Sequence, residues 1–537
     1  MLVYMTCKAW ILLRSLSGPR KEKGGQIPFF HAMFSVPRIS LWPGQSTTLG
    51  SGELPSSPSG GLAWGELGWL LPRLRTGSPQ LWYSVFLKGS PIAQLAQTHG
   101  NVFTVWLGST PIVVLSGFQA VKEALVSNSE QFSGRPLTPF FRDLFGEKGV
   151  ICSNGHTWRQ QRRFCLTTLR ELGLGKQALE LRLQHEAAEL VKVFRQEQGR
   201  PFDPQAPIVR STTRVIGALV FGHHLLSEEP IFLELIQAVN LGLAFASTIW
   251  RRLYDMFPWA LRYLSGPHQK IFQYHEAVKG FIRHEIIRHK LRAPEAPKDF
   301  INCYLSQITK AMADPVSTFN EENLIQVVID LFLGGTDTTA TTLHWALIHL
   351  VHHGAVQERV QQELDEVLGT SQAVCYEDRE RLPYTRAVLH EVQRLSSVVA
   401  VGAVRQCVTS TWMHGYYVPK GTIILPNLAS VLYDPECWET PQQFNPGHFL
   451  DKDGNFVANE AFLPFSAGHR VCPGEQLARM ELFLMFATLL RTFRFQLPEG
   501  SQGLRLEYVF GGTLQPQPQK IRAVLRLSSL SPREEGL

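Results

Sequence analysis

The longest helical pattern in the chain runs from Asn323 to Val351 and contains no proline. At a rise of about 1.5 Å per residue, roughly 30 residues span about 45 Å, the width of a whole domain. The pattern is apolar on most faces, so this helix must be enclosed by other elements. The Thr318-Phe319-Asn320-Glu321 segment just before it has the spacing of a capping box. A large domain built around one central helix is therefore expected.

Other segments show helical or β periodicity. Two β-branched and apolar runs around a Gly-Ser-Thr-Pro turn, between Asn101 and Gly117, predict a β-hairpin. Short strands are expected around Gly415–Leu425. Further helices are expected at Gln119–Ser127, Trp158–Leu169, Lys176–Gln196, Pro230–Leu243, His268–Arg288, Phe300–Met312, Val356–Leu368, Thr385–Leu395 and Glu475–Phe493.

The distribution of Gly, Pro and Ser indicates the domain boundaries. These residues are concentrated between Ser15 and Pro79, which predicts an irregular lead-in over residues 1–80. No linker is evident beyond it, so one domain over residues 81–527 and a short tail at 528–537 are expected. The apolar stretch Met1–Leu13 is too short to span a membrane, which takes about 20 residues. A weak membrane or signal-like segment and a presequence are both open interpretations.

Charge and cysteine content exclude some classes of function. The formal net charge of +6 is too diffuse to indicate nucleic-acid binding. It suits an acidic protein partner or an anionic membrane surface, and scattered solvated charge explains it as well. The eight cysteines form no Cys-x-x-Cys pair, which argues against a structural zinc site or a thioredoxin-like motif.

The segment FLPFSAGHRVCPGEQLARMELF carries the strongest chemical signal. Phe465, Gly468, Arg470, Cys472 and Gly474 follow the spacing Phe-x-x-Gly-x-Arg-x-Cys-x-Gly. Cys472 precedes a predicted helix, whose N-terminus favours a thiolate. The glycines permit tight turns that bring amide groups toward the sulfur, and Phe465 can shield it from water. A lone cysteine before a helix is usually a buried structural thiol, but five matching positions favour a ligand loop.

These five residues resemble the signature of the cytochrome P450 superfamily, and segments from Leu81 onward resemble the animal microsomal family-two members. The resemblance implies the mainly α haem-thiolate fold with a small β-sheet region. It also implies haem b as cofactor, with Cys472 as the axial ligand of the iron. A thiolate ligand of this kind favours cleavage of the O–O bond.

The central helix contains GGTDTT at Gly334–Thr339, which resembles the oxygen-activation motif of the family. Each glycine costs a helix about 1 kcal/mol relative to alanine, so two adjacent glycines need a reason. The resemblance implies space for dioxygen and substrate here, with Thr338 hydrogen-bonding the oxygen and Asp337 relaying protons. Local capping by the Asp and Thr side chains is the alternative for this motif alone.

Residues elsewhere in the chain match the haem-supporting positions of the family. Glu391 and Arg394 form the Glu-x-x-Arg pair, and His448 stands where the family often has an arginine. Arginine forks bind carboxylates in pairs, which suits haem propionates. The resemblance assigns propionate binding to Arg135, Trp158, Arg162, Arg405 and Arg470. It implies pocket-lining segments at Pro136–Ile151, Leu241–Trp250, Leu333–Thr338, Val398–Ala403 and Phe510–Thr513.

The implied function is insertion of one oxygen atom from O₂ into a small apolar substrate of xenobiotic, fatty acid or steroid type. Electrons would come from NADPH through NADPH-cytochrome P450 reductase, with cytochrome b5 as a second candidate donor. Arg159 and Arg163 are candidates for the exposed basic face that binds the electron-donor protein. The expected location is the cytosolic face of the endoplasmic reticulum membrane, with mitochondria as the alternative. A haem-thiolate isomerase or peroxygenase, and a non-enzymatic haem-binding relative, remain open.

A second membrane contact is expected between two middle helices, where apolar and aromatic residues lie beside Arg251 and Arg252. Packing under the substrate pocket is the alternative explanation for these side chains. The apolar and aromatic residues of this segment are Leu241, Leu243, Phe245, Ile249, Trp250, Phe257 and Trp259.

Overall fold

The structure is a computed structural model of the 537-residue chain. It describes residues 39–40, 91–107, 110–172, 177–222, 242, 245, 248–292, 299–369, 373–510 and 512–526. The expected helix at Pro230–Leu243, the lead-in apart from residues 39–40, and the tail lie outside the described residues.

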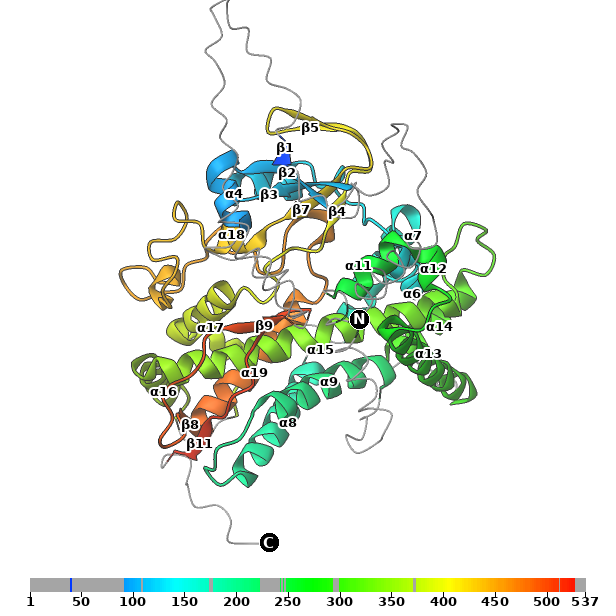
Figure 1. The fold of residues 1–537 in the computed structure, drawn as a ribbon. Coiled ribbons are helices and arrows are strands. Elements are labelled where there is room, and N and C mark those ends of the chain that lie inside the picture. Colours follow the sequence, from blue (N-terminus) through cyan, green and yellow to red (C-terminus); the bar gives the residue numbers. More distant parts are fainter. Residues whose placement is uncertain are drawn as a thin grey trace, which may run out of the picture.

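The central helix α15 runs from Glu321 to His352 and crosses the molecule from side to side (Figure 1). Its N-cap is Asn320, whose side-chain oxygen accepts a hydrogen bond from the Asn323 amide at 2.9 Å. The expectation of a capping box at Thr318 is therefore wrong. The Thr318 hydroxyl instead donates to the Gln160 side chain at 2.6 Å, because the competing Asn320 cap lies directly at the helix start.

A long helix that the sequence pattern did not reveal packs along α15. This helix, α9, spans Gln205–Phe221 and is buried on most of its faces. Its residues include many β-branched Val, Ile and Thr, which have a lower intrinsic helix propensity. Burial against α15 overrides that propensity, and Gly222 ends the helix in a left-handed conformation with φ of 71°.

Strands gather at one side of the molecule in a five-stranded sheet of order β1-β2-β3-β7-β4, at the top of Figure 1. The predicted hairpin is confirmed as β2 (Val102–Leu107) antiparallel to β3 (Thr110–Leu115), with Val105 opposite Ile112. Strand β7 (Ile423–Pro426) pairs with β3 in parallel, which confirms one of the later strands. The other strands are β1 (Ile39–Ser40), β4 (Arg405–Gln406), β5 (Thr411–Met413), β6 (Tyr416–Val418), β8 (Phe493–Gln496), β9 (Tyr508–Phe510), β10 (Leu514–Pro516) and β11 (Arg522–Leu525).

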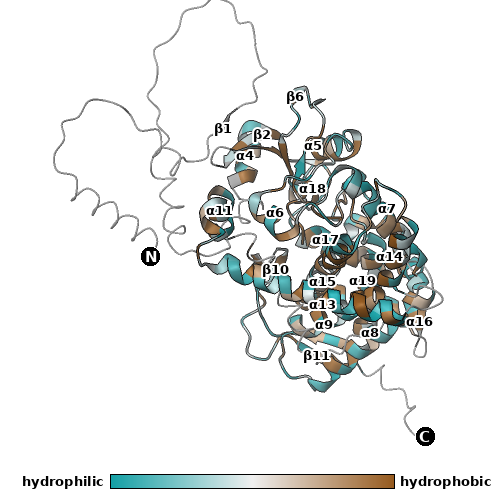
Figure 2. Cartoon of the chain, turned by 90° about the vertical axis from the view of Figure 1, so that its right-hand side faces the viewer, coloured by the Kyte–Doolittle hydropathy of each residue, from teal (hydrophilic) through white to brown (hydrophobic). Residues whose placement is uncertain are grey.

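The remaining helices surround α15, and the mainly α fold class is confirmed. Figure 2 shows apolar residues concentrated in the helices at the centre and hydrophilic residues along the outer ones. The expected helix at Gln119–Ser127 is confirmed as α5 (Phe118–Lys122) continued by the π-helical turn η2 (Glu123–Ser127). The other helices are α4 (Pro91–His99), α6 (Pro139–Phe145), α7 (Gly155–Glu171), α8 (Gln177–Gln196), α11 (Ile249–Met256), α12 (Pro258–Leu261), α13 (Pro267–Arg292), α14 (Phe300–Lys310), α16 (Gly354–Leu368), α17 (Pro383–Ser396), α18 (Leu428–Leu432) and α19 (Glu475–Thr492), with 3-10 turns η3 (Tyr376–Glu380), η4 (Pro446–Phe449) and η5 (Gly468–Arg470).

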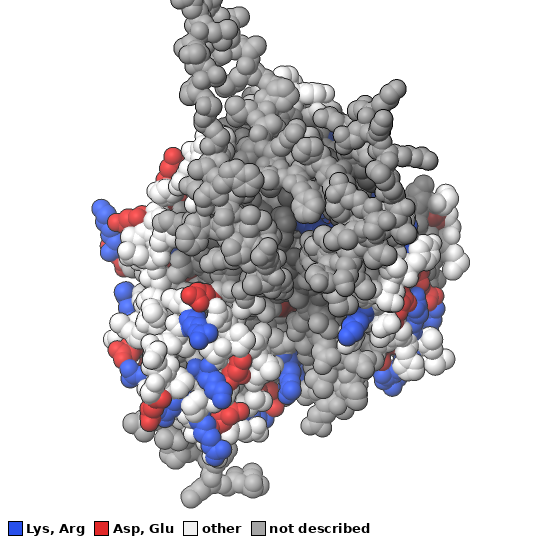
Figure 3. Space-filling model, in the orientation of Figure 1, with Lys and Arg blue, Asp and Glu red and all other residues white. Residues whose placement is uncertain are grey.

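Charged side chains of both signs are interspersed over the described part of the face in Figure 3, in agreement with a diffuse net charge. None of the described helices combines the length and the apolar character that a bilayer-spanning segment requires.

Candidate active site

The cysteine loop lies between η5 and α19, and backbone contacts fix its path. The Cys472 amide donates to the Phe465 carbonyl at 3.0 Å. Gly468 has φ of 73°, and a side chain there would collide with the Leu125 carbonyl oxygen, so only glycine fits. Gly474 lies in a turn, but its φ of −94° is one that any residue adopts, so this turn does not itself require glycine. What Gly474 provides is an amide close to the sulfur.

Cys472 is an exposed residue, although protein closely surrounds its loop. Burial raises the pKa of its thiol. The amides of Gly474 and Glu475 and the charge of Arg162 act in the opposite direction and lower that pKa, whereas the Glu475 charge raises it. The backbone therefore points donors at the sulfur from the N-terminal end of α19, as the sequence predicted.

Arg470 and Trp158 form the first part of a cationic cluster beside this loop. The Arg470 guanidinium lies 3.9 Å from the centre of the Trp158 ring. It donates to the carbonyls of Ser133 at 2.8 Å, Val150 at 3.1 Å and Ser153 at 2.7 Å. The indole Nε1 of Trp158 is buried and has no hydrogen-bond partner among the described residues.

Three further arginines complete this cationic cluster. Arg135 donates to the carbonyls of Ala403 and Val404 at 2.7 and 2.8 Å. Arg162 donates to the Val471 carbonyl, beside the cysteine, at 2.6 Å. Arg405 donates to the Ser466 hydroxyl at 3.2 Å, and its Nη1 is buried without a partner among the described residues. The structure thus brings all five predicted propionate-binding residues together beside the Cys472 loop.

The electrostatics of the cluster indicate what it can bind. Burial, together with repulsion from Arg135 and Arg162, lowers the pKa of Arg470 to about 8. Burial also lowers the pKa of Arg135 to about 10 and holds that of Arg405 well below its usual range. No described carboxylate forms an ion pair with any of the four arginines. A group with two carboxylates supplies the missing negative charge, so these residues fit the two propionates of haem.

The GGTDTT motif divides its side chains between two faces of α15. Gly334 is exposed and Thr338, four residues later, lies on the same face. The Thr338 hydroxyl donates to the Gly334 carbonyl at 2.7 Å. Asp337 is buried on a different face, and burial raises the pKa of its carboxyl, whereas hydrogen bonds from Thr513 and Gln515 lower it.

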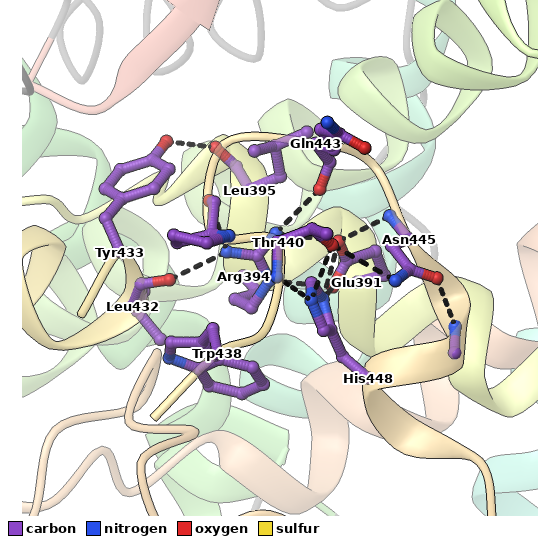
Figure 4. Close-up of polar contacts among 12 residues, drawn as sticks. Glu391, Arg394, Leu395, Leu432, Tyr433, Trp438, Thr440, Gln443, Asn445 and His448 are labelled. Atoms are coloured by element: carbon purple, nitrogen blue, oxygen red, sulfur yellow. Dashed lines mark hydrogen bonds and ion pairs between the residues drawn. The ribbon is translucent and has the colours of Figure 1, made fainter. Parts of the chain in front are cut away.

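Figure 4 shows the predicted Glu391–Arg394 pair at the centre of a buried polar network. Two guanidinium nitrogens of Arg394 each lie 2.7 Å from a Glu391 oxygen, and both side chains are fully buried. Arg394 also donates to the carbonyls of Leu432, Pro441 and Gln443. His448 Nδ1 lies 3.2 Å from Glu391, so it occupies the expected third position.

The sequence did not predict the residues that fix the segment from Val150 to Asn154, whose carbonyls bind Arg470. Asp330 of α15 accepts hydrogen bonds from the amides of Val150 and Ile151 at 2.6 and 3.0 Å. Asn154 accepts from the Arg135 amide at 2.7 Å. An acidic residue inside the apolar run VVIDLF is a signal that could have revealed Asp330, because a buried acid needs partners.

Several segments expected to line a pocket meet in the structure. The Leu514 amide donates to the Val398 carbonyl at 2.9 Å, which joins the Val398–Ala403 segment to β10. Phe140 packs against Phe245 and Tyr254, so the Pro136–Ile151 segment lies beside the start of α11. Half of the Leu241–Trp250 segment and the tip residue Gly511 lie outside the described residues.

Comparisons with known proteins agree with this geometry. The cytochrome P450 family model matches residues 72–523. Cytochrome P450 2J5 of Mus musculus is 41% identical over 437 residues, covering 81% of this chain and 87% of the mouse protein. Cytochrome P450 2J2 of Homo sapiens is 39% identical over 457 residues, 83% of this chain and 91% of the human protein. Cytochrome P450 2F2 of Mus musculus is 40% identical over 406 residues, 75% of this chain and 83% of that protein.

Proposed function

The chain belongs to the cytochrome P450 family, and on that premise we propose that Cys472 would bind the haem iron and that the arginine cluster would hold the haem. The protein is a haem-thiolate monooxygenase with haem b as cofactor. Haem bound through a thiolate supplies an iron centre that activates dioxygen. The observation that carries the residue assignment is the cluster of four arginines beside Cys472, in which Arg405 and Trp158 each have a buried donor without a partner among the described residues.

The residues around the cofactor have separate tasks. Arg135, Arg162, Arg405 and Arg470 bind the propionates, and the Trp158 indole adds one donor. The amides of Gly474 and Glu475 stabilise negative charge on the sulfur, because each removes electron density from it. Phe465 limits water access to the sulfur. Glu391, Arg394 and His448 fix the segment that follows α18, since their side chains bind its carbonyls and amides.

Thr338 and Asp337 handle protons. Thr338 lies beside the exposed Gly334, where a small molecule can approach the helix, and its hydroxyl can both donate and accept. Asp337 is the adjacent acid in the sequence, and burial raises the pKa of its carboxyl. A carboxyl group can accept and release protons in catalysis. The substrate is a small apolar molecule, in keeping with the aromatic cluster of Phe140, Phe245 and Tyr254.

Electrons reach the enzyme from a redox partner. We propose NADPH-cytochrome P450 reductase as the donor, with cytochrome b5 as a second one, at a basic surface that includes Arg159 and Arg163. Both side chains are exposed on α7, the helix that also carries Trp158 and Arg162. Residues 81–527 form the catalytic domain, and the protein works at the cytosolic face of the endoplasmic reticulum membrane.

A membrane contact at α11 and α12 follows from exposed apolar side chains. The structure divides the expected residues: Phe245 is buried, Trp250 and Phe257 are half-buried, and Leu241 and Leu243 lie outside the described residues. Arg251 lies over the Phe141 ring and pairs with Asp255, so it faces inward. The outward apolar residues are Ile249, Met256, Trp259, Tyr263 and Leu264, of which Trp259 and Tyr263 are 72% and 85% exposed.

The ligand assignment is tested by the carbon monoxide difference spectrum of the reduced protein. Cys472→Ala should abolish the thiolate-type absorption and the oxygenase activity, whereas Cys303→Ala, a half-buried cysteine on α14, should keep both. Thiolate-type absorption in the purified Cys472→Ala variant would overturn the assignment. Dependence of product formation on NADPH separates a monooxygenase from a peroxide-using enzyme.

A further inference from the structure

The Asp337 carboxylate is held by two side chains from the far end of the chain. The Thr513 hydroxyl donates to Oδ2 at 2.6 Å, and the Gln515 amide donates to Oδ1 at 2.8 Å. Successive residues of an α-helix diverge by about 100°, so Asp337 and Thr338 face different directions. Both carboxylate oxygens are therefore engaged on the side away from Gly334 and Thr338.

The strand that carries these donors is itself fixed. Thr513 and Gln515 are two residues apart, so they project from the same face of the β10 segment. The Trp345 indole donates to the Leu514 carbonyl at 2.7 Å, from a residue about two turns further along α15 than Asp337. The Leu514 amide donates to the Val398 carbonyl. Strand β9 also pairs with β10 in an antiparallel arrangement, so these contacts together fix the position of the two donors.

No cation neutralises the Asp337 carboxylate among the described residues. Burial raises the pKa of this carboxyl, and only the two neutral donors oppose that effect. Hydrogen bonds to the ionised form stabilise it, so loss of either donor should raise the pKa further. Gln515 Oε1 also lies 3.5 Å from Gln205 Nε2, at the half-buried start of α9. The polar chain from Asp337 thus leads toward the surface.

We propose that Thr513 and Gln515 are positioning residues for oxygen activation, which orient the Asp337 carboxylate through these two hydrogen bonds. The inference rests on the proposed role of Asp337 and Thr338. It extends the proton-handling unit from two adjacent residues of α15 to a pair of side chains about 180 positions later in the sequence.

The test compares the ratio of product formed to NADPH consumed across pH 6 to 9 in Thr513→Val and Gln515→Leu. In wild type the ratio should increase with pH as the Asp337 carboxyl ionises. Both variants should lower the ratio at pH 7 by several-fold and shift this increase to higher pH. Their carbon monoxide difference spectra should be unchanged. Thr513→Ser keeps the hydroxyl and should behave as wild type. Gln517→Leu makes the same change two residues away, where the side chain binds Glu507 instead, and should also behave as wild type.

Two further variants separate the possible failures. Asp337→Asn should lower the same ratio, and adding Thr513→Val to it should have no further effect. A normal ratio in Asp337→Asn would refute the proposed role of Asp337. A low ratio in Asp337→Asn, with normal pH profiles in Thr513→Val and Gln515→Leu, would overturn the positioning inference alone. Urea unfolding provides a readout that is independent of activity, because the Asp337→Asn and Thr513→Val effects on unfolding should be non-additive. Additive effects would show that the contact is absent.

Discussion

Glu391→Gln should be among the most destabilising single substitutions in the chain. Glu391 and Arg394 are both fully buried and are joined by two 2.7 Å contacts. Removing one partner of a buried pair leaves the other charge without compensation, which costs about 3–5 kcal/mol of unfolding free energy. The glutamine oxygen can still accept from the Asn445 amide, which bonds Glu391 at 2.8 Å. Its NH2 group replaces the second oxygen that accepts from Arg394, so the variant loses the negative charge and one hydrogen bond.

The assay is urea unfolding at pH 7 followed by tryptophan fluorescence, with the free energy obtained by linear extrapolation. The buried Trp438 ring, which lies 5.2 Å from the Arg394 guanidinium, is one of the twelve tryptophans that contribute to the signal. The matched control is Glu189→Gln, since Glu189 and Lys192 form an ion pair of the same spacing on the surface of α8. That pair should contribute less than about 1 kcal/mol.

The three carbonyls around Arg394 provide a second comparison. Arg394→Lys keeps the positive charge but cannot reach Leu432, Pro441 and Gln443 together, so it should cost nearly as much as Glu391→Gln. If Glu391→Gln costs no more than Glu189→Gln, the buried pair does not stabilise the domain by charge compensation and the reasoning is refuted.

Three other substitutions test the site and its surroundings. Burial raises the pKa of Asp330 to about 6, so this carboxyl lowers the free energy of unfolding as pH rises from about 4 to 6. Relative to Asp330→Asn, wild type should lose about 2–3 kcal/mol of unfolding free energy over that range. Equal pH profiles of unfolding in the two proteins would contradict the assignment. Thr338→Ala should keep haem binding but divert NADPH electrons to hydrogen peroxide, measured as the ratio of product to NADPH consumed, and an unchanged ratio would count against its role. Trp259→Ser with Tyr263→Ser should weaken sedimentation of the full chain with anionic vesicles, whereas Leu291→Ser, an exposed apolar residue on α13, should not; equal sedimentation of both would refute the contact.

The parts of the site that lie close together in sequence were predictable. Phe465, Gly468, Arg470 and Cys472 occur within eight residues, and local backbone geometry converts their spacing into a loop before a helix. The central helix was equally clear, because its apolar pattern is long and uninterrupted. The position at which this helix begins was not clear, since Thr318 and Asn320 are both good capping residues. Only the packing of Gln160 against Thr318 selects Asn320 as the cap.

The parts that escaped prediction depend on tertiary packing. Helix α9 (Gln205–Phe221) carries β-branched residues that local propensity does not assign to a helix, and its long contact with α15 stabilises it. The partners of Asp337 lie some 176 and 178 positions away, on a strand whose sequence has no distinctive feature. No local rule links a buried carboxylate to a donor at that separation, so only the fold identifies the pair.

The two buried carboxylates of α15 suggest how the helix shapes the surroundings of the active site. Asp330 and Asp337 are seven residues apart, which places them two turns apart along the helix. Asp330 binds the amides of Val150 and Ile151, and Asp337 binds Thr513 and Gln515. Both held segments belong to or adjoin regions expected to line the substrate pocket. Each carboxylate fixes one of these segments to the helix that carries Thr338. A substitution at either acid should therefore change substrate preference, although neither acid side chain contacts the substrate.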